Sequence, residues 1–141
     1  MPGSAIGTFE VKVAPVTGDS GQTVASGRLT LNKTYQGDLA GTGNGEMWTV
    51  DTSVEGSGGY VAIERFAGDL HGRHGAFVLL HQATMRHGGA YKLSLVVVPD
   101  SGTDQLEGLS GSMAIIIAKG KHSYDFDYSI SESATPSTPP R

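Results

Sequence analysis

Glycine is the feature of this sequence that most limits what the chain can fold into. The 141 residues include 21 glycines, roughly twice the usual share of about 7%. They divide the chain into short stretches, and 76–87 and 90–101 are among the longest without a glycine. An α-helix usually needs about ten residues without a helix breaker, and both stretches are rich in the β-branched and aromatic residues of strands. The glycine pattern therefore predicts an all-β protein.

About eight strands can be placed from the pattern of apolar and polar residues. The alternation is clearest at Phe9, Val11 and Val13, which are separated by polar residues, and it indicates a strand with one buried face. The predicted strands are Ala5–Ala14, Gln22–Tyr35, Asp38–Asp51, Gly58–Ala67, Ala76–Met85, Ala90–Pro99, Ser112–Ala118 and His122–Ile130.

A short repeated motif indicates how these strands are connected. The residues GDLAG at 37–41 return 31 positions later as GDLHG at 68–72, with a looser echo, EGLSG, at 107–111. Glycine allows positive φ and aspartate bonds nearby backbone amides, so these motifs are predicted hairpin turns. Short strands joined by tight turns form an up-and-down meander, and closing the meander removes its exposed edges. The predicted fold is a single eight-stranded antiparallel up-and-down barrel, whose interior is either filled or holds one small ligand.

Composition and charge restrict the function classes. A hydrophobic content of 38% fits one domain, placed at residues 1–130, and the Ser/Thr/Pro-rich residues 131–141 are predicted to be a disordered tail. The net charge of −4 without a basic cluster argues against nucleic acid, and no apolar run is long enough for a membrane helix. The chain has no cysteine and begins without signal-peptide features, which favours a cytoplasmic location. His71 and His74 lack a third ligand nearby, so neither a metal nor another cofactor is expected.

The candidate site combines ionisable and aromatic residues on neighbouring strands. Alternation places these on one face of each strand: Glu46 and Trp48 on the third, Tyr60, Glu64 and Phe66 on the fourth, and Phe77, His81 and Met85 on the fifth. If these faces point inward, two carboxylates and an imidazole meet in an apolar cavity, where acid and base can coexist near neutral pH. Glu46, Glu64 and His81 are therefore candidate catalytic residues for acid–base chemistry.

Apolar side chains of the barrel are the candidate ligand contacts. The candidate ligand-binding residues are Trp48, Tyr60, Phe66, Phe77, Met85 and Tyr124. They can grip a flat or apolar molecule, but simple core packing explains the aromatic residues as well. Glu46 or Glu64 can equally pair with Arg65, Arg73 or Lys33 on an outer face, because alternation does not show which face is inside.

Several motifs distributed along the chain resemble those of one bacterial protein family. They are GTFEV at 7–11, GEM at 45–47, VEGSGGYVAIER at 54–65, VVPDSGT at 97–103, LEGLSG at 106–111 and GKHSY at 120–124. Together they resemble the DUF3224 family of uncharacterised proteins over roughly residues 5–130. The resemblance implies an eight-stranded barrel similar to plant allene oxide cyclase. That wider group includes dirigent-like proteins and spirotetronate-forming cyclases, in which an apolar barrel steers the ring closure of its substrate. No catalytic residue is carried over from the cyclases, because no matching motif is present.

Two functions from different classes follow as expectations. The first is a barrel that binds a small apolar molecule in its lumen and acts as a cofactor-independent isomerase or cyclase. The alternative is a non-catalytic structural or binding homo-oligomer with a filled barrel. The consecutive apolar residues 115–117, which suggest cover on both faces, favour a homo-oligomer in either case. A third expectation concerns the polar loop Pro99–Gly111, which could form a mouth, a lid or a partner-binding surface.

Overall fold

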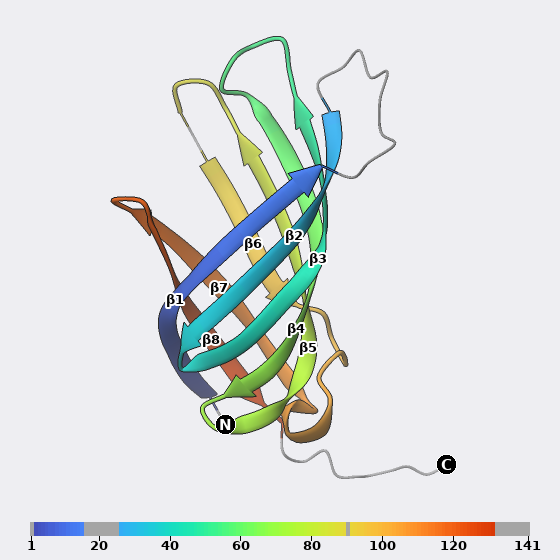
Figure 1. The fold of residues 1–141 in the computed structure, drawn as a ribbon, viewed down its shortest axis with the longest axis vertical. Helices are drawn as coiled ribbons and strands as arrows, with labels where there is room; N and C mark the ends of the chain where they lie inside the picture. The colour runs from blue at the N-terminus through green and yellow to red at the C-terminus, as the bar shows by residue number, and fades with distance from the viewer. Residues whose placement is uncertain (1, 16–25, 90, 132–141) are drawn as a thin grey trace.

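Eight antiparallel strands, each paired with its neighbours in the chain, form a barrel that closes where β1 pairs with β8 (Figure 1). The computed structural model describes residues 2–15, 26–89 and 91–131. The strands are β1 (Pro2–Pro15), β2 (Ser26–Gly37), β3 (Leu39–Asp51), β4 (Gly58–Leu70), β5 (Arg73–Met85), β6 (Tyr91–Val97), β7 (Leu109–Ala118) and β8 (Lys121–Ile130). The predicted all-β, up-and-down barrel is confirmed. Residues 22–25 of the second predicted strand and residues 132–141 of the predicted tail lie outside the described residues.

Alternation along the strands decides which side chains enter the barrel. In β4, Ala62, Glu64 and Phe66 are at most 1% exposed, whereas the residues between them, Ile63 and Arg65, face outward. The same two-residue period runs along β5, where positions 75, 77, 79, 81 and 83 are all buried. This is the pattern expected of strands with one face toward a core and one toward solvent.

The repeated GDL motifs meet each other in space. Leu39 lies opposite Leu70 where β3 pairs with β4. The two copies play different parts, however, since the β2–β3 turn lies at the start of the first copy and the β4–β5 turn at the end of the second. Gly37 and Gly72 supply the left-handed backbone at these turns, with φ of 110° and 82°. The predicted hairpin turns are confirmed at both copies.

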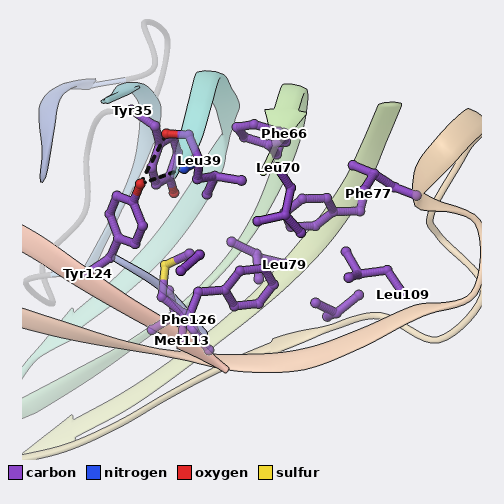
Figure 2. Close-up of a cluster of buried hydrophobic side chains, with 14 of the residues drawn as sticks. Tyr35, Leu39, Phe66, Leu70, Phe77, Leu79, Leu109, Met113, Tyr124 and Phe126 are labelled. Atoms are coloured by element: carbon purple, nitrogen blue, oxygen red, sulfur yellow. Dashed lines mark hydrogen bonds between the residues drawn. The ribbon is translucent and has the colours of Figure 1, made fainter. Parts of the chain in front are cut away.

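One half of the barrel is filled by packed side chains (Figure 2). It contains the first residues of the odd-numbered strands and the last residues of the even-numbered ones. Phe66 and Phe77 have ring centroids 4.9 Å apart, and Phe77 stacks on Phe126 at 5.8 Å. The Tyr124 hydroxyl accepts a hydrogen bond from the Leu39 amide at 2.8 Å and lies 3.0 Å from the Gln36 carbonyl, which ties β8 to the β2–β3 turn.

The β6–β7 connection closes this packed half. It includes a short 3-10 helix, η1 (Asp104–Leu106), and Leu106 is fully buried. The Thr103 amide donates to the Ala76 carbonyl at 2.9 Å, so the loop is bound to β5. The loop predicted as a mouth or lid therefore covers the filled end of the barrel.

Candidate functional site

A cluster of four polar side chains lies buried inside the barrel. Glu64 on β4 is its centre and is fully buried, while Lys33 on β2 and His81 on β5 are 6% and 3% exposed. The Glu64 carboxylate accepts a hydrogen bond from the Tyr35 hydroxyl at 2.5 Å, through Oε2. Its other oxygen, Oε1, lies 2.7 Å from His81 Nε2 and 3.2 Å from Lys33 Nζ. The carboxylate thus has partners at both oxygens, as a buried charge requires.

Glycines on β3 allow Glu64 to reach across that strand to β2. Gly43 lies between Lys33 on β2 and Phe66 on β4 in the pairing register. A Cβ atom at Gly43 would overlap the Glu64 carboxylate. The glycine-lined strand therefore provides the space through which β4 contacts β2.

Burial and charge act in opposite directions on Glu64. Burial alone would raise its pKa, but the hydrogen bond from His81, the charge of Lys33 and the Tyr35 hydroxyl together lower it. For Lys33, burial lowers the pKa, and the neighbouring Glu64 only partly opposes this effect. Burial and the Glu64 charge raise the pKa of Tyr35 well above its ordinary value. Glu64 is thus an anion at neutral pH, and Tyr35 keeps its proton.

An ionised Glu64 sets the role of each His81 nitrogen. A carboxylate can only accept hydrogen bonds, so His81 Nε2 carries a hydrogen and donates it. The Nδ1 nitrogen of His81 has no hydrogen-bond partner among the residues that the structure describes. A neutral His81 therefore has a free basic nitrogen, with Glu64 in position to stabilise the imidazolium that forms when this nitrogen takes a proton.

The second half of the barrel holds a cavity of about 180 Å³ next to this cluster. All eight strands contribute inward-facing residues to its lining: Phe9, Val11, Val13, Leu31, Lys33, Met47, Tyr60, His81, Tyr91, Leu93, Ile115, Ile117 and His122. Most of these side chains are apolar. Lys33 and His81 belong to both the lining and the cluster, so two ionisable side chains of the cluster face a mainly apolar space, which His122 also lines.

The structure places three of the predicted site residues together. Glu64 and His81 are in direct contact, and Tyr60 lines the cavity with its ring centroid 6.4 Å from that of His81. Burial, with the nearby Tyr91 and Glu64, raises the pKa of Tyr60 to about 12. Glu64 and His81 therefore lie in the barrel interior among apolar residues, while their catalytic role stays a prediction.

The prediction was wrong for Glu46 and Trp48, which lie on the outer face of β3. Glu46 pairs with Arg28 at 3.5 Å, and Trp48 is 55% exposed with the Arg28 guanidinium 5.2 Å from its ring centre. The physical reason is that the inward-facing positions of β3 are the odd-numbered ones, three of which are the glycines at 41, 43 and 45, so the even-numbered Glu46 and Trp48 face outward. The alternative expectation was an outer-face ion pair of Glu46 or Glu64 with Arg65, Arg73 or Lys33. Glu46 does form an outer-face ion pair, but its partner is Arg28.

Four predicted ligand contacts lie elsewhere on the inner face. Phe66, Phe77 and Tyr124 belong to the packed half, where neighbouring side chains fill the space. Met85 is on the same face of β5 as His81 but does not line the cavity. These residues are therefore parts of the core or the barrel end.

Sequence reasoning missed Lys33 and Tyr35 as members of the site. Lys33 was considered only as an outer-face partner of a glutamate, whereas it pairs with Glu64 inside the barrel. A signal was present, because Leu31, Lys33 and Tyr35 alternate along β2 and a lysine between two apolar residues shares their face. His122 on β8 is half-buried and also lines the cavity.

A metal centre has little support in the described part of the chain. Glu64 and His81 could supply two ligands, but no group of three histidine, cysteine or acidic side chains is placed to hold an ion among the described residues.

No helix among those residues has the length and hydropathy needed to cross a bilayer.

Comparison with known proteins identifies the family. No protein with a curated description matches this chain. A solved structure of a DUF3224-family protein of unknown function from Shewanella oneidensis MR-1 is 41% identical, with a TM-score of 0.86, and the alignment covers 93% of this chain and 99% of that one. The family model described as "Protein of unknown function (DUF3224)" matches residues 5–128. The chain therefore belongs to the DUF3224 family.

Proposed function

We propose that this barrel binds a small, mainly apolar molecule in its lumen and that His81, oriented by Glu64, transfers a proton in an isomerisation or cyclisation of that molecule. One observation carries the proposal: the buried Glu64–His81 pair lies beside a mainly apolar cavity of about 180 Å³. Ionisable groups are rarely placed in such surroundings unless they are paired, and active sites are where they are most often found.

The size of the cavity supports a ligand with one or two fused rings. A cavity of about 150 Å³ lined by apolar side chains holds benzene, and this one is somewhat larger. Tyr60, Tyr91 and Phe9 supply flat surfaces in the lining, and aromatic side chains favour flat apolar ligands.

The Glu64–His81 pair has the parts that general base catalysis requires. The base must be neutral before it accepts a proton, and the charge that it acquires must then be compensated. Glu64 supplies that compensation at 2.7 Å. Returning the proton to another atom of the substrate completes an isomerisation without a cofactor.

Two probes test the proposal without knowledge of the natural substrate. Toluene reports binding, because a ligand that binds only the folded protein raises its melting temperature. The compound 5-nitrobenzisoxazole reports general base catalysis, since removal of its C–H proton opens the ring to a coloured phenolate. Ile115→Phe fills the cavity, and Ile116→Phe, its outward-facing neighbour at 47% exposure, is the matched control.

We expect toluene to stabilise the parent protein and Ile116→Phe but not Ile115→Phe. His81→Gln, which keeps a donor for Glu64, should still bind toluene and should lose the elimination activity by about 100-fold. Equal effects of toluene on both isoleucine variants would overturn binding in the lumen. An unchanged elimination rate in His81→Gln would overturn the acid–base role.

The outer surface supports a second candidate, self-association. Apolar side chains lie opposite one another on the outer face of β3 to β6. Trp48 on β3 pairs with Val61 on β4, and Leu80 on β5 lies between Ile63 on β4 and Val96 on β6. Each is 37% exposed or more, and a contiguous exposed apolar patch indicates an interaction surface. We propose a second copy of the chain as its occupant. Sedimentation analysis of the parent and of Leu80→Lys would show a dimer or larger oligomer for the parent only, and a monomeric parent would refute it.

A further inference from the structure

The amine of Lys33 lies in surroundings unlike those of the other lysines. It is 6% exposed and lines the cavity. The remaining four lysines of the chain are all exposed: Lys12, Lys92, Lys119 and Lys121. Burial favours the neutral form of an amine, and a neutral amine is a nucleophile. Lys33 is therefore the lysine best placed to react with a molecule in the lumen.

Glu64 can compensate a positive charge on either of two neighbours. Its Oε1 atom lies 3.2 Å from Lys33 Nζ and 2.7 Å from His81 Nε2. One arrangement places a charged lysine beside a neutral imidazole, and the other places a neutral amine beside an imidazolium. Both contain one cation beside one anion, so the net charge of the buried cluster is the same. The cluster can thus present a neutral Lys33 amine without leaving a buried charge uncompensated.

We propose that Lys33 is a nucleophile that forms an imine with a small, mainly apolar aldehyde or ketone held in the cavity. This inference rests on the proposed function, because it names the substrate class of the same lumenal site. The supporting geometry is the amine in the lining, the carboxylate in contact with it and the imidazole on the same carboxylate oxygen.

The bond changes balance with the groups present. The lone pair of the neutral Lys33 amine attacks the carbonyl carbon, the C–N bond forms, and the π electrons of the C=O bond move to oxygen, which takes a proton from the His81 imidazolium. The nitrogen then returns a proton to His81, giving a neutral carbinolamine. His81 protonates the hydroxyl group, the C–O bond breaks, water leaves, and the nitrogen lone pair completes the C=N bond. The resulting iminium ion takes the place of the ammonium beside Glu64, and His81 is neutral again.

Reductive trapping tests this step on the full chain. The protein is incubated with benzaldehyde and sodium cyanoborohydride at pH 7, digested, and each lysine is assayed for an added benzyl group by mass spectrometry. An exposed lysine with a pKa near 10.4 is almost fully protonated at this pH, so we expect Lys33 to be modified at least about tenfold faster than the four exposed lysines. Ile115→Phe should abolish the advantage of Lys33, and Ile116→Phe should keep it. Toluene at saturation should suppress the labelling of Lys33 alone.

The outcomes separate this inference from the binding on which it rests. If toluene stabilises the protein but Lys33 reacts no faster than the exposed lysines, the imine is refuted and lumenal binding stands. If toluene neither stabilises the protein nor protects Lys33, binding in the lumen is refuted. Fast labelling of Lys33 that persists in Ile115→Phe would also refute the inference, because the aldehyde would then reach the amine without occupying the cavity.

Discussion

The Lys33–Glu64 pair predicts a measurable loss of stability when either charge is removed. Glu64→Gln keeps the shape of the side chain but leaves the Lys33 ammonium without its anion, at a site where both residues are at most 6% exposed. Breaking a buried ion pair from one side typically lowers the free energy of unfolding by about 3–5 kcal/mol. We expect a loss of about 3 kcal/mol, at the lower end, because Lys33 can reduce the penalty by releasing its proton.

A double-mutant cycle of Lys33→Met and Glu64→Gln isolates the interaction between the two charges. Lys33→Met leaves Glu64 with donors from Tyr35 and His81, so we expect a smaller loss of about 2 kcal/mol, the value of a hydrogen bond to a charged group. The double variant should be no less stable than Glu64→Gln alone, because it contains no unpaired charge. The coupling energy should therefore reach about 2 kcal/mol, within the range for residues in contact.

The outer-face pair Arg28–Glu46 is the matched control. Its side chains are 33% and 54% exposed and the closest atoms are 3.5 Å apart. Exposed pairs typically couple by less than about 1 kcal/mol. Urea unfolding at pH 7 measures both cycles, and a loss of 3 kcal/mol corresponds to a fall in Tm of about 10 °C for a domain of this size. Additive effects of Lys33→Met and Glu64→Gln, or coupling no larger than that of the control, would refute the reasoning.

Three further predictions concern the same cluster. The folded pKa of Glu64 lies below its unfolded value of about 4.3. The stability that its ionisation contributes is therefore present above the unfolded pKa and is lost as the pH falls through the folded pKa. Lys33→Met should move this loss of stability to higher pH, which circular dichroism titrations would measure. Gly43→Ala should lower the free energy of unfolding by roughly 1–3 kcal/mol in thermal melts, because the added Cβ overlaps the Glu64 carboxylate. Gly27→Ala is the control and should change the free energy of unfolding little, since its Cβ would lie an ordinary 3.8 Å from the Thr49 hydroxyl. Equal effects of the two variants would contradict the prediction. Tyr35→Phe should cost about 1.5–3 kcal/mol in urea titrations, and a neutral result would show that its hydrogen bond to Glu64 contributes nothing.

The fold could be predicted from the sequence because its determinants are local. The period of two along each strand and the glycines between strands act within a few residues, and they specify strands and hairpins without reference to distant contacts. The strand ends were less predictable. β7 begins at Leu109 rather than at the predicted Ser112, since Leu109 packs into the filled half of the barrel, a contact made only in the folded chain.

The site could be predicted only where alternation also revealed the inner face. On β4 and β5, large apolar residues beside Glu64 and His81 identify that face. On β3 three successive inner positions, 41, 43 and 45, are glycines, which carry no hydropathy signal, so Trp48 indicated the wrong side. The division of the interior into a packed half and a cavity is not a local property, because it depends on which side chains from all eight strands meet at one level.

The buried cluster is not explained by its contribution to stability. A buried ion pair is often no more stabilising than apolar residues of similar volume, and glycines inside a strand weaken it. Yet Gly43 leaves the space in which Glu64 contacts Lys33 and Tyr35. A barrel selected only for stability would fill this level with apolar side chains, as it does around Phe77. The proposed function accounts for the arrangement, because it needs an amine and an imidazole that face a cavity while sharing one carboxylate oxygen, and Lys33 and His81 are therefore the residues at which we propose to test it.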